Sequence, residues 1–219
     1  MNILTIDVGG THVKILTNHA REPRRFPSGP KMTADDMVKQ VRALASGWKF
    51  DVVTIGYPGP VKDSQVIAEP HNLATGWVGF DFAAAFGCPV KLINDAAMQA
   101  LGSYNCGKML FLGLGTGLGT TLIVNEFILP MELGHLPYKK GTFEDYVGER
   151  GLERMGKKKW RVHVENVTCR LIQALMPDDV VLGGGNTRLL DHLPAGCRAG
   201  DNANAFLGGF RLWRADKGA

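Results

Sequence analysis

Residues 3–16 read ILTIDVGGTHVKIL, a stretch in which two apolar runs flank a pair of glycines. This pattern predicts a buried strand, a tight glycine turn and a returning strand. Residues 109–124 repeat the plan, because the run GLGTGLG at 113–119 separates two further strand-like segments. The two stretches lie about 106 residues apart, roughly half the chain, which predicts two related halves of α/β architecture. Coincidence between two ordinary hairpins is the alternative.

The rest of the chain alternates strand-like with helix-like segments, which predicts mostly parallel sheets with crossover connections. We expect further strands at residues 51–55, 90–93 and 180–182, and helices at residues 34–45, 80–86, 95–103, 160–175 and 203–213. No linker or low-complexity tract interrupts the chain. We therefore expect an N-terminal lobe of residues 1–94, on which a closing helix of residues 203–219 packs, and a C-terminal lobe of residues 95–202.

Length and composition limit the class of protein. A chain of 219 residues that is 45% hydrophobic and 21% charged has the composition of a globular protein with one large or two small domains. Its apolar runs are shorter than the roughly 18 to 20 residues of a membrane helix, and residues 3–6 form a strand-like run without a charged leader, so we expect a cytoplasmic protein without membrane contact. The four cysteines form no Cys-x-x-Cys pair, which predicts reduced thiols and no structural zinc.

The first glycine turn has the chemistry of an anion site. Asp7 ends the first strand, Gly9 and Gly10 follow it, and Thr11 adds a hydroxyl. Consecutive glycine amides can bind phosphate in a concave turn, and a carboxylate beside them can hold Mg²⁺ through water. We therefore predict a phosphate site with Asp7 as its magnesium residue. A hairpin turn with a capping aspartate is the alternative.

The two later glycine clusters predict further ligand surfaces. Glycine at every second position of residues 113–119 leaves one strand face without side chains, so a bulky ligand can lie against the backbone beside Thr116. The glycine turn at residues 183–185 offers a third such surface. The sequence contains neither G-x-G-x-x-G nor a Walker A motif, which argues against two common nucleotide-binding folds.

Two polar residues end the strand expected at residues 90–93. Asn94 and Asp95 lie at its carboxyl end, where open α/β sheets bind ligands. Phosphoryl transfer to an alcohol needs a carboxylate that accepts the hydroxyl proton. We predict Asp95 as that base and Asn94 as a residue that orients the alcohol. A simple helix cap is the alternative for Asp95.

A later polar stretch supplies side chains that can bind a polyol. Glu132, His135 and Glu144 offer two carboxylates and an imidazole, each of which can be shared between neighbouring hydroxyl groups. A structural histidine is the alternative for His135. A zinc site is not expected here, because residues 136–162 contain neither cysteine nor histidine.

Six motifs in this order resemble the ROK family of sugar kinases and repressors, and most closely its polyphosphate glucokinase branch. The motifs are Asp7-Val8-Gly9-Gly10-Thr11, Gly56-Tyr57-Pro58-Gly59, Leu92-Ile93-Asn94-Asp95, Leu114-Gly115-Thr116-Gly117, Glu132-Leu133-Gly134-His135 and Leu182-Gly183-Gly184-Gly185. The resemblance implies an actin-like (ribonuclease H-like) fold of two α/β lobes with a sugar in the central cleft. It also implies an Mg²⁺-dependent kinase that transfers a phosphoryl group from ATP or inorganic polyphosphate to the 6-hydroxyl of a hexose, with glucose as the first expectation.

The resemblance also assigns roles to individual residues. Asp95 matches the catalytic base of the family. The positions that match sugar-binding residues are Asn94, Glu132, His135, Glu144 and Asn72. The positions that match donor-binding residues are Asp7, Gly9, Gly10, Thr11, Lys14, Gly115, Thr116, Gly117, Gly184 and Gly185. The chain lacks the family's cysteine-rich zinc motif and an N-terminal helix-turn-helix, so we expect neither zinc nor a repressor. The chain is short for the family, so the resemblance does not decide whether a full adenosine pocket is present. A homodimer is one expectation.

Positive charge is concentrated in residues 139–161, where eight Lys/Arg and four Asp/Glu account for the whole net charge of +4. Such a stretch can hold a polyphosphate chain, and a solvated helix face is the alternative. Nucleic acid is not expected, because the stretch has few aromatic residues. Two other functions remain open: a sugar-binding or sensor protein that has lost transfer, and a kinase for another hexose, since hydroxyl stereochemistry is recognised by geometry.

Overall fold

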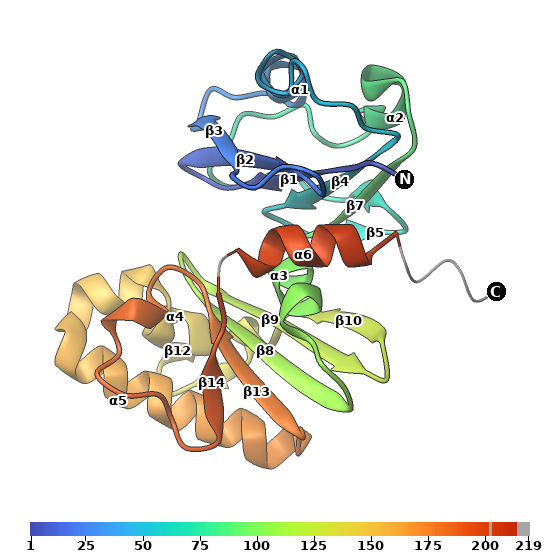
Figure 1. Cartoon of the computed structure of the whole chain (residues 1–219). Helices are drawn as coiled ribbons and strands as arrows, with labels where there is room; N and C mark the ends of the chain where they lie inside the picture. Colours follow the sequence, from blue (N-terminus) through green and yellow to red (C-terminus); the bar gives the residue numbers. More distant parts are fainter. Residues whose placement is uncertain (202, 214–219) are drawn as a thin grey trace. The chain divides into compact units, whose positions relative to one another are not determined.

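The computed structural model describes residues 1–201 and 203–213, which contain two five-stranded sheets of the same plan (Figure 1). The strand orders are β3-β2-β1-β4-β7 and β10-β9-β8-β13-β14. In each sheet the first two pairings are antiparallel and the last two are parallel. The shared plan confirms the two related halves that the glycine turns predicted.

The chain divides into two compact units, Met1–Gly102 with the segment from Ala205 onward, and Ser103–Asn204. The strands of the first unit are β1 (Ile3–Val8), β2 (His12–Thr17), β3 (Arg24–Pro27), β4 (Val52–Tyr57), the short pair β5 (Val61–Lys62) and β6 (Gln65–Val66), and β7 (Val90–Asn94). Its helices are α1 (Ala34–Leu44), α2 (Phe82–Phe86), α3 (Asp95–Ser103) and α6 (Asn204–Arg211). Residues 214–219 of the expected closing helix lie outside the described residues.

Helices cover both faces of the first sheet (Figure 1). Leu4 and Ile6 of β1 are fully buried in a cluster that includes Met37 and Val41 of α1. Helix α1 begins where the sequence predicts, because Thr33 and Asp36 form a reciprocal capping box. Helices α3 and α6 lie on the opposite face (Figure 1).

The division of the chain after Gly102 differs from the boundary expected at Asn94, and it groups α3 with the first sheet. Arg211 Nη1 of α6 donates to the carbonyl oxygen of Leu101 at 2.8 Å. Gly208 lies so close to α3 that a Cβ there would collide with the carbonyl oxygen of Met98. Helix α6 also packs on β1, since a Cβ on Gly209 would collide with the Thr5 side chain. Helices α3 and α6 are therefore grouped with the sheet that contains β1.

The second unit contains the other sheet and two helices. Its strands are β8 (Lys108–Leu114), β9 (Leu118–Val124), β10 (Phe127–Met131), the short pair β11 (Pro137–Tyr138) and β12 (Gly141–Thr142), β13 (Asp179–Gly183) and β14 (Cys197–Ala199). Its α-helices are α4 (Phe143–Val147) and α5 (Glu149–Leu175), with short 3-10 turns at η1 (Leu133–His135) and η2 (Thr187–Leu189). Leu110, Leu112, Trp160 and Val164 belong to one buried cluster between sheet and helices.

Two sequence-based expectations were wrong in part. The sheets are mixed rather than mostly parallel, because each glycine turn returns the chain as an antiparallel hairpin and β3 or β10 extends it. The long helix begins at Glu149, well before Trp160, and it bends at Gly156, whose φ is 73°. None of the helices in the described part of the chain combines the length and apolar character needed to cross a bilayer.

Candidate active site

Asp7 lies near the end of β1, directly opposite Lys14 of β2 in the antiparallel ladder. The Lys14 Nζ atom is 3.6 Å from Asp7 Oδ2, and the Asp7 side chain keeps 20% of its surface exposed. Burial raises the pKa of Asp7, while the nearby Lys14 ammonium lowers it. The first unit thus presents a carboxylate and an ammonium side by side at the glycine turn.

The glycine turn itself is held by its own backbone. The Gly9 amide donates to the carbonyl oxygen of His12 at 3.0 Å, and the Ser28 hydroxyl donates to the carbonyl oxygen of Gly9 at 2.6 Å. Because the Gly9 amide is used inside the turn, a bound phosphate is expected to take its amide donors from Gly10 and Thr11. Ser28 is a supporting residue that the sequence analysis missed, since no local pattern connects it to Gly9.

Asn72 reaches this turn from a distant loop. A Cβ built on Gly10 would lie 3.4 Å from the Asn72 Cβ, so the two residues are close neighbours. Asn72 is exposed. The structure therefore brings one predicted sugar-binding residue next to the predicted phosphate turn, within the same unit.

Asn94 and Asp95 have different roles at the junction of β7 and α3. The Asn94 Oδ1 atom accepts from the Ala97 amide at 3.1 Å, and its Nδ2 atom donates to the carbonyl oxygen of Gly59 at 3.1 Å. Asn94 therefore caps α3, which is the role considered for Asp95 as the alternative to catalysis. Both the oxygen and the nitrogen of the Asn94 side-chain amide are used in these hydrogen bonds, so Asn94 stabilises the junction between β7 and α3.

Asp95 has the electrostatic environment of a proton acceptor. Burial of its carboxyl raises its pKa to about 7, the charge of Asp7 adds to that increase, and a hydrogen bond from the Ala96 amide at 2.7 Å opposes it. A carboxylate with a pKa near neutrality is matched to general-base work at physiological pH.

Three predicted sugar-binding residues lie together in the second unit. His135 Nε2 is 3.7 Å from Glu144 Oε1, and a Cβ on Gly117 would lie 2.6 Å from Glu144 Oε2. Glu132 immediately precedes the 3-10 turn η1, where its carbonyl oxygen accepts from the His135 amide at 3.1 Å. The Glu144 carboxylate therefore lies beside the second glycine turn, with the His135 imidazole close to it.

The second and third glycine turns are neighbours within the same unit. Gly184, with φ of 84°, packs against the backbone of Leu114, where a Cβ would collide. Asn186 Nδ2 donates to the carbonyl oxygen of Gly115 at 3.2 Å, and the Asn186 amide donates to that of Leu114 at 3.0 Å. Asn186 is a second residue that the sequence analysis missed, although its place directly after Gly185 was a usable signal.

The basic stretch contributes fewer available charges than its sequence suggests. Arg161 pairs with Asp191 and donates to the carbonyl oxygen of Leu189, so it is used inside the unit. Lys157, Lys158 and Lys159 are exposed on α5, just after the bend at Gly156. Of the six residues expected to form a polyphosphate track, Lys139, Lys140, Lys157, Lys158, Lys159 and Arg161, the five lysines are exposed.

The Asp7 carboxylate fits the role of a single protein ligand of a magnesium ion. Within residues 1–201 and 203–213, no group of three or more His, Cys, Asp or Glu side chains could form a metal cage. Mg²⁺ does not require one, because it keeps several waters and binds through one or two carboxylates together with substrate phosphates. The partly exposed Asp7 carboxylate beside the phosphate turn satisfies that requirement.

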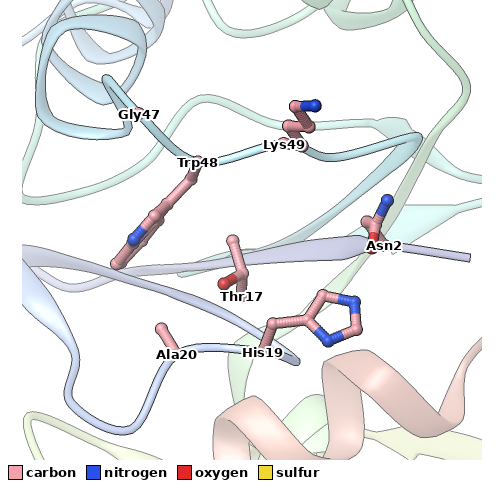
Figure 2. A pocket seen from close by; sticks show the side chains of 7 residues that line it. All are labelled: Asn2, Thr17, His19, Ala20, Gly47, Trp48 and Lys49. Atoms are coloured by element: carbon pink, nitrogen blue, oxygen red, sulfur yellow. The ribbon is translucent and has the colours of Figure 1, made fainter.

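The first unit also has a surface pocket of about 320 Å³ at the start of β1 (Figure 2). Its lining residues are Asn2, Thr17, His19, Ala20, Gly47, Trp48 and Lys49. None of them is among the predicted sugar-binding or phosphate-binding residues. The pocket is therefore not part of the predicted sugar-binding or phosphate-binding sites.

Comparison with known proteins agrees with this fold and with these motifs. A sequence model of the ROK family matches residues 3–160. A polyphosphate glucokinase from Mycobacterium tuberculosis is 27% identical over 207 residues, covering 86% of this chain and 74% of that protein.

Two solved structures share the fold. The inorganic polyphosphate/ATP-glucomannokinase from Arthrobacter sp. strain KM superposes with a TM-score of 0.83 at 22% identity, covering 98% of this chain and 99% of that one. A ROK family glucokinase from Streptomyces griseus, solved in complex with glucose and AMPPNP, gives a TM-score of 0.79 at 16% identity, covering 98% and 100%.

The duplicated sheets and glycine turns thus define a protein of the actin-like α/β class. Within that class the chain belongs to the ROK family.

Proposed function

We propose that this protein is a hexose kinase, which transfers a phosphoryl group from ATP or inorganic polyphosphate to the 6-hydroxyl of a hexose, with glucose as the first substrate to test. The observation that carries the proposal is Asp95, whose pKa of about 7 suits a general base, in the same unit as the phosphate turn. The relatives support the same reading, because they include a polyphosphate glucokinase and a glucokinase.

The proposed chemistry is one phosphoryl transfer. The sugar O6 attacks the terminal phosphorus of the donor, the bond from that phosphorus to the leaving phosphate oxygen breaks, and the O6 proton passes to the Asp95 carboxylate. Asn94 keeps the β7–α3 junction in place through its bonds to Ala97 and Gly59, so that Asp95 starts the helix in a defined position. Mg²⁺, when bound beside Asp7, supplies the positive charge that neutralises the phosphates.

Each unit contains residues with a proposed binding role. In the second unit, Glu132, His135 and Glu144 supply carboxylate and imidazole groups for sugar hydroxyl groups. In the first unit, the exposed amide of Asn72 has the same proposed role. For the phosphoryl donor, the turn that contains Gly10 is the candidate in the first unit, and the turns that contain Gly115 and Gly184 are the candidates in the second, each through backbone amides.

Either phosphoryl donor is compatible with this proposal. The exposed lysines on α5 favour a polyanionic donor, because they are neighbours in sequence and separate from the ion pair of Arg161. ATP needs an adenosine pocket in addition, which the lysines do not provide. The ratio of rates with the two donors therefore decides between them.

The deciding experiment is a coupled assay for glucose 6-phosphate with purified protein, glucose and Mg²⁺, run in parallel with ATP and with inorganic polyphosphate. Turnover with either donor supports the kinase. Silence with both donors leads to a panel of other hexoses, and turnover there identifies a kinase for another sugar. Sugar binding by calorimetry without donor consumption would instead identify a sugar-binding or sensor protein.

A further inference from the structure

A single carboxylate closes the loop that precedes α2. Glu69 accepts three backbone hydrogen bonds, from the amides of Gly76 at 3.2 Å, Trp77 at 3.1 Å and Val78 at 3.3 Å. The side chain thereby ties the start of the loop at residue 69 to its end at residues 76–78. Burial acts to raise the pKa of Glu69, but the three amide hydrogen bonds together lower it by more. The net effect is a lowered pKa, which keeps the group as a carboxylate.

Both ends of the loop are attached to the core of the first unit. The Tyr57 hydroxyl donates to the carbonyl oxygen of Ala68 at 2.9 Å, immediately before Glu69. At the other end, Trp77 is fully buried and its ring lies 5.5 Å from that of Tyr57 and 6.2 Å from that of Phe82. Both ends of the loop are therefore fixed to the core of the first unit, and residues 70–75 form its middle.

The middle of the loop carries Asn72 to the phosphate turn. Leu73 is buried, whereas His71 and Asn72 are exposed, and the Asn72 side chain lies so near Gly10 that a Cβ built there would be 3.4 Å from the Asn72 Cβ. A second tie comes from the Ala74 amide, which donates to the carbonyl oxygen of Met32 at 3.1 Å. The only carboxylate that links the two ends of this segment among the described residues is that of Glu69.

We propose that Glu69 is a positioning residue of the sugar site: by closing the loop of residues 69–78 it holds Asn72 against Gly10, and through Asn72 it sets the affinity for the sugar. Glu69 does not itself touch the substrate. This inference rests on the proposed hexose kinase activity, since the effect is read through sugar binding.

The first experiment compares Glu69→Ala with wild-type protein in steady-state kinetics. We expect the KM for the sugar to rise about tenfold, the scale of one lost hydrogen bond, while the KM for the phosphoryl donor changes less than about twofold. Glu69→Gln keeps the shape and one acceptor oxygen, so its sugar KM should lie between those of the wild type and the alanine variant. Equal increases in both KM values would contradict a positioning role.

A matched control separates positioning from general loosening. Asp81→Ala removes another carboxylate that accepts a backbone amide, that of Ala84 at 2.9 Å, at the start of the neighbouring α2. We expect this variant to lower the melting temperature about as much as Glu69→Ala, with the sugar KM unchanged. A sugar KM that rises equally in both variants would overturn the proposal.

A double-mutant cycle tests whether Glu69 acts through Asn72. Glu69→Ala should raise the sugar KM in the wild-type background and have little further effect in an Asn72→Ala background, because the residue that it positions is then absent. Fully additive effects would overturn the proposal even if each single variant is impaired.

Hydrogen exchange distinguishes failure of this inference from failure of the proposed function. The amides of Gly76, Trp77 and Val78 should exchange faster in Glu69→Ala than in the wild type, whether or not the protein is a kinase. A wild type without hexose kinase activity overturns the proposed function and, with it, the sugar role of Glu69. If the wild type is an active hexose kinase, and Glu69→Ala exchanges these amides faster with an unchanged sugar KM, the inference alone is overturned.

Discussion

Lys14 Nζ lies 3.6 Å from Asp7 Oδ2 because the two residues are direct partners in the β1–β2 ladder. The ammonium opposes the effect of burial on Asp7 and favours its charged form. That charge in turn helps to raise the pKa of Asp95 at the start of α3. Three residues from separate elements of one unit therefore form a connected electrostatic group, in which two flank the phosphate turn and the third is the proposed base.

Replacing Lys14 by methionine should weaken binding of the phosphoryl donor. The variant loses a positive charge beside the glycine turn, so we expect the donor KM to rise about tenfold, as for one charge-assisted contact, with little change in the sugar KM. Lys14→Arg should retain most of the donor affinity. The control is Lys39→Met, which removes an exposed lysine from the helix pair with Asp35. A Lys14→Met variant with the donor KM of the control would exclude the donor role.

Replacing Asp95 by asparagine should abolish turnover and leave sugar binding intact. Asparagine has nearly the same shape but cannot accept the hydroxyl proton, so kcat should fall by about 10² to 10⁴. Coupled assays measure kcat, and calorimetry with glucose measures binding. A variant that turns over at the wild-type rate would show that another group is the base.

The activity of the wild-type protein should rise with pH through about 7. Asp95 must be deprotonated to accept a proton, and its pKa of about 7 places half of that change near neutrality. The measurement is kcat/KM for the sugar between pH 5.5 and 8.5 at saturating Mg²⁺ and donor, a range chosen to span about 1.5 units on either side of the pKa. A flat profile across this range would contradict the assignment, because an ordinary exposed aspartate is already ionised there.

The same carboxyl should make the fold less stable as pH rises. A group whose pKa is higher in the folded than in the unfolded state contributes stability below its unfolded pKa of 3.8, and that contribution disappears as pH rises to about 7. Asp95→Asn removes this dependence. The free energy of unfolding of both proteins is measured in urea at pH 4 and at pH 8. On going from pH 4 to pH 8, the stability of the variant relative to that of the wild type should increase by about 1 to 3 kcal/mol. Parallel pH dependence of the two proteins would rule out the raised pKa.

The three lysines after the bend in α5 should affect kcat/KM for polyphosphate much more than kcat/KM for ATP. A triple Lys157→Gln, Lys158→Gln, Lys159→Gln variant should lower kcat/KM for polyphosphate about tenfold or more and reduce its dependence on salt, because fewer counterions are released on binding. The value for ATP should change much less. A matched triple of exposed lysines in the first unit, Lys39→Gln, Lys49→Gln and Lys62→Gln, controls for net charge. Equal losses in both triples would indicate a solvated helix face.

Local patterns in the sequence correctly predicted that this protein is built from two related halves. The glycine turns at residues 9–10 and 113–119 predicted two related halves, and Thr33 predicted the start of α1. Such features are accessible because a tight turn or a helix cap depends on residues that are adjacent in the chain. The order of the six motifs likewise led to the ROK family, which the family comparison confirms.

Contacts between distant segments were decided only by the tertiary structure. The approach of Asn72 to Gly10 and the support of Gly9 by Ser28 both join segments without a shared local pattern. The same holds for charge: the pKa of Asp95 depends on burial and on Asp7, which lies far away in the sequence. The sequence by itself determined which chemical groups are present and which turns carry them. The tertiary structure alone decided which of those groups are desolvated and which meet, because burial and Coulomb interactions depend on distances in space.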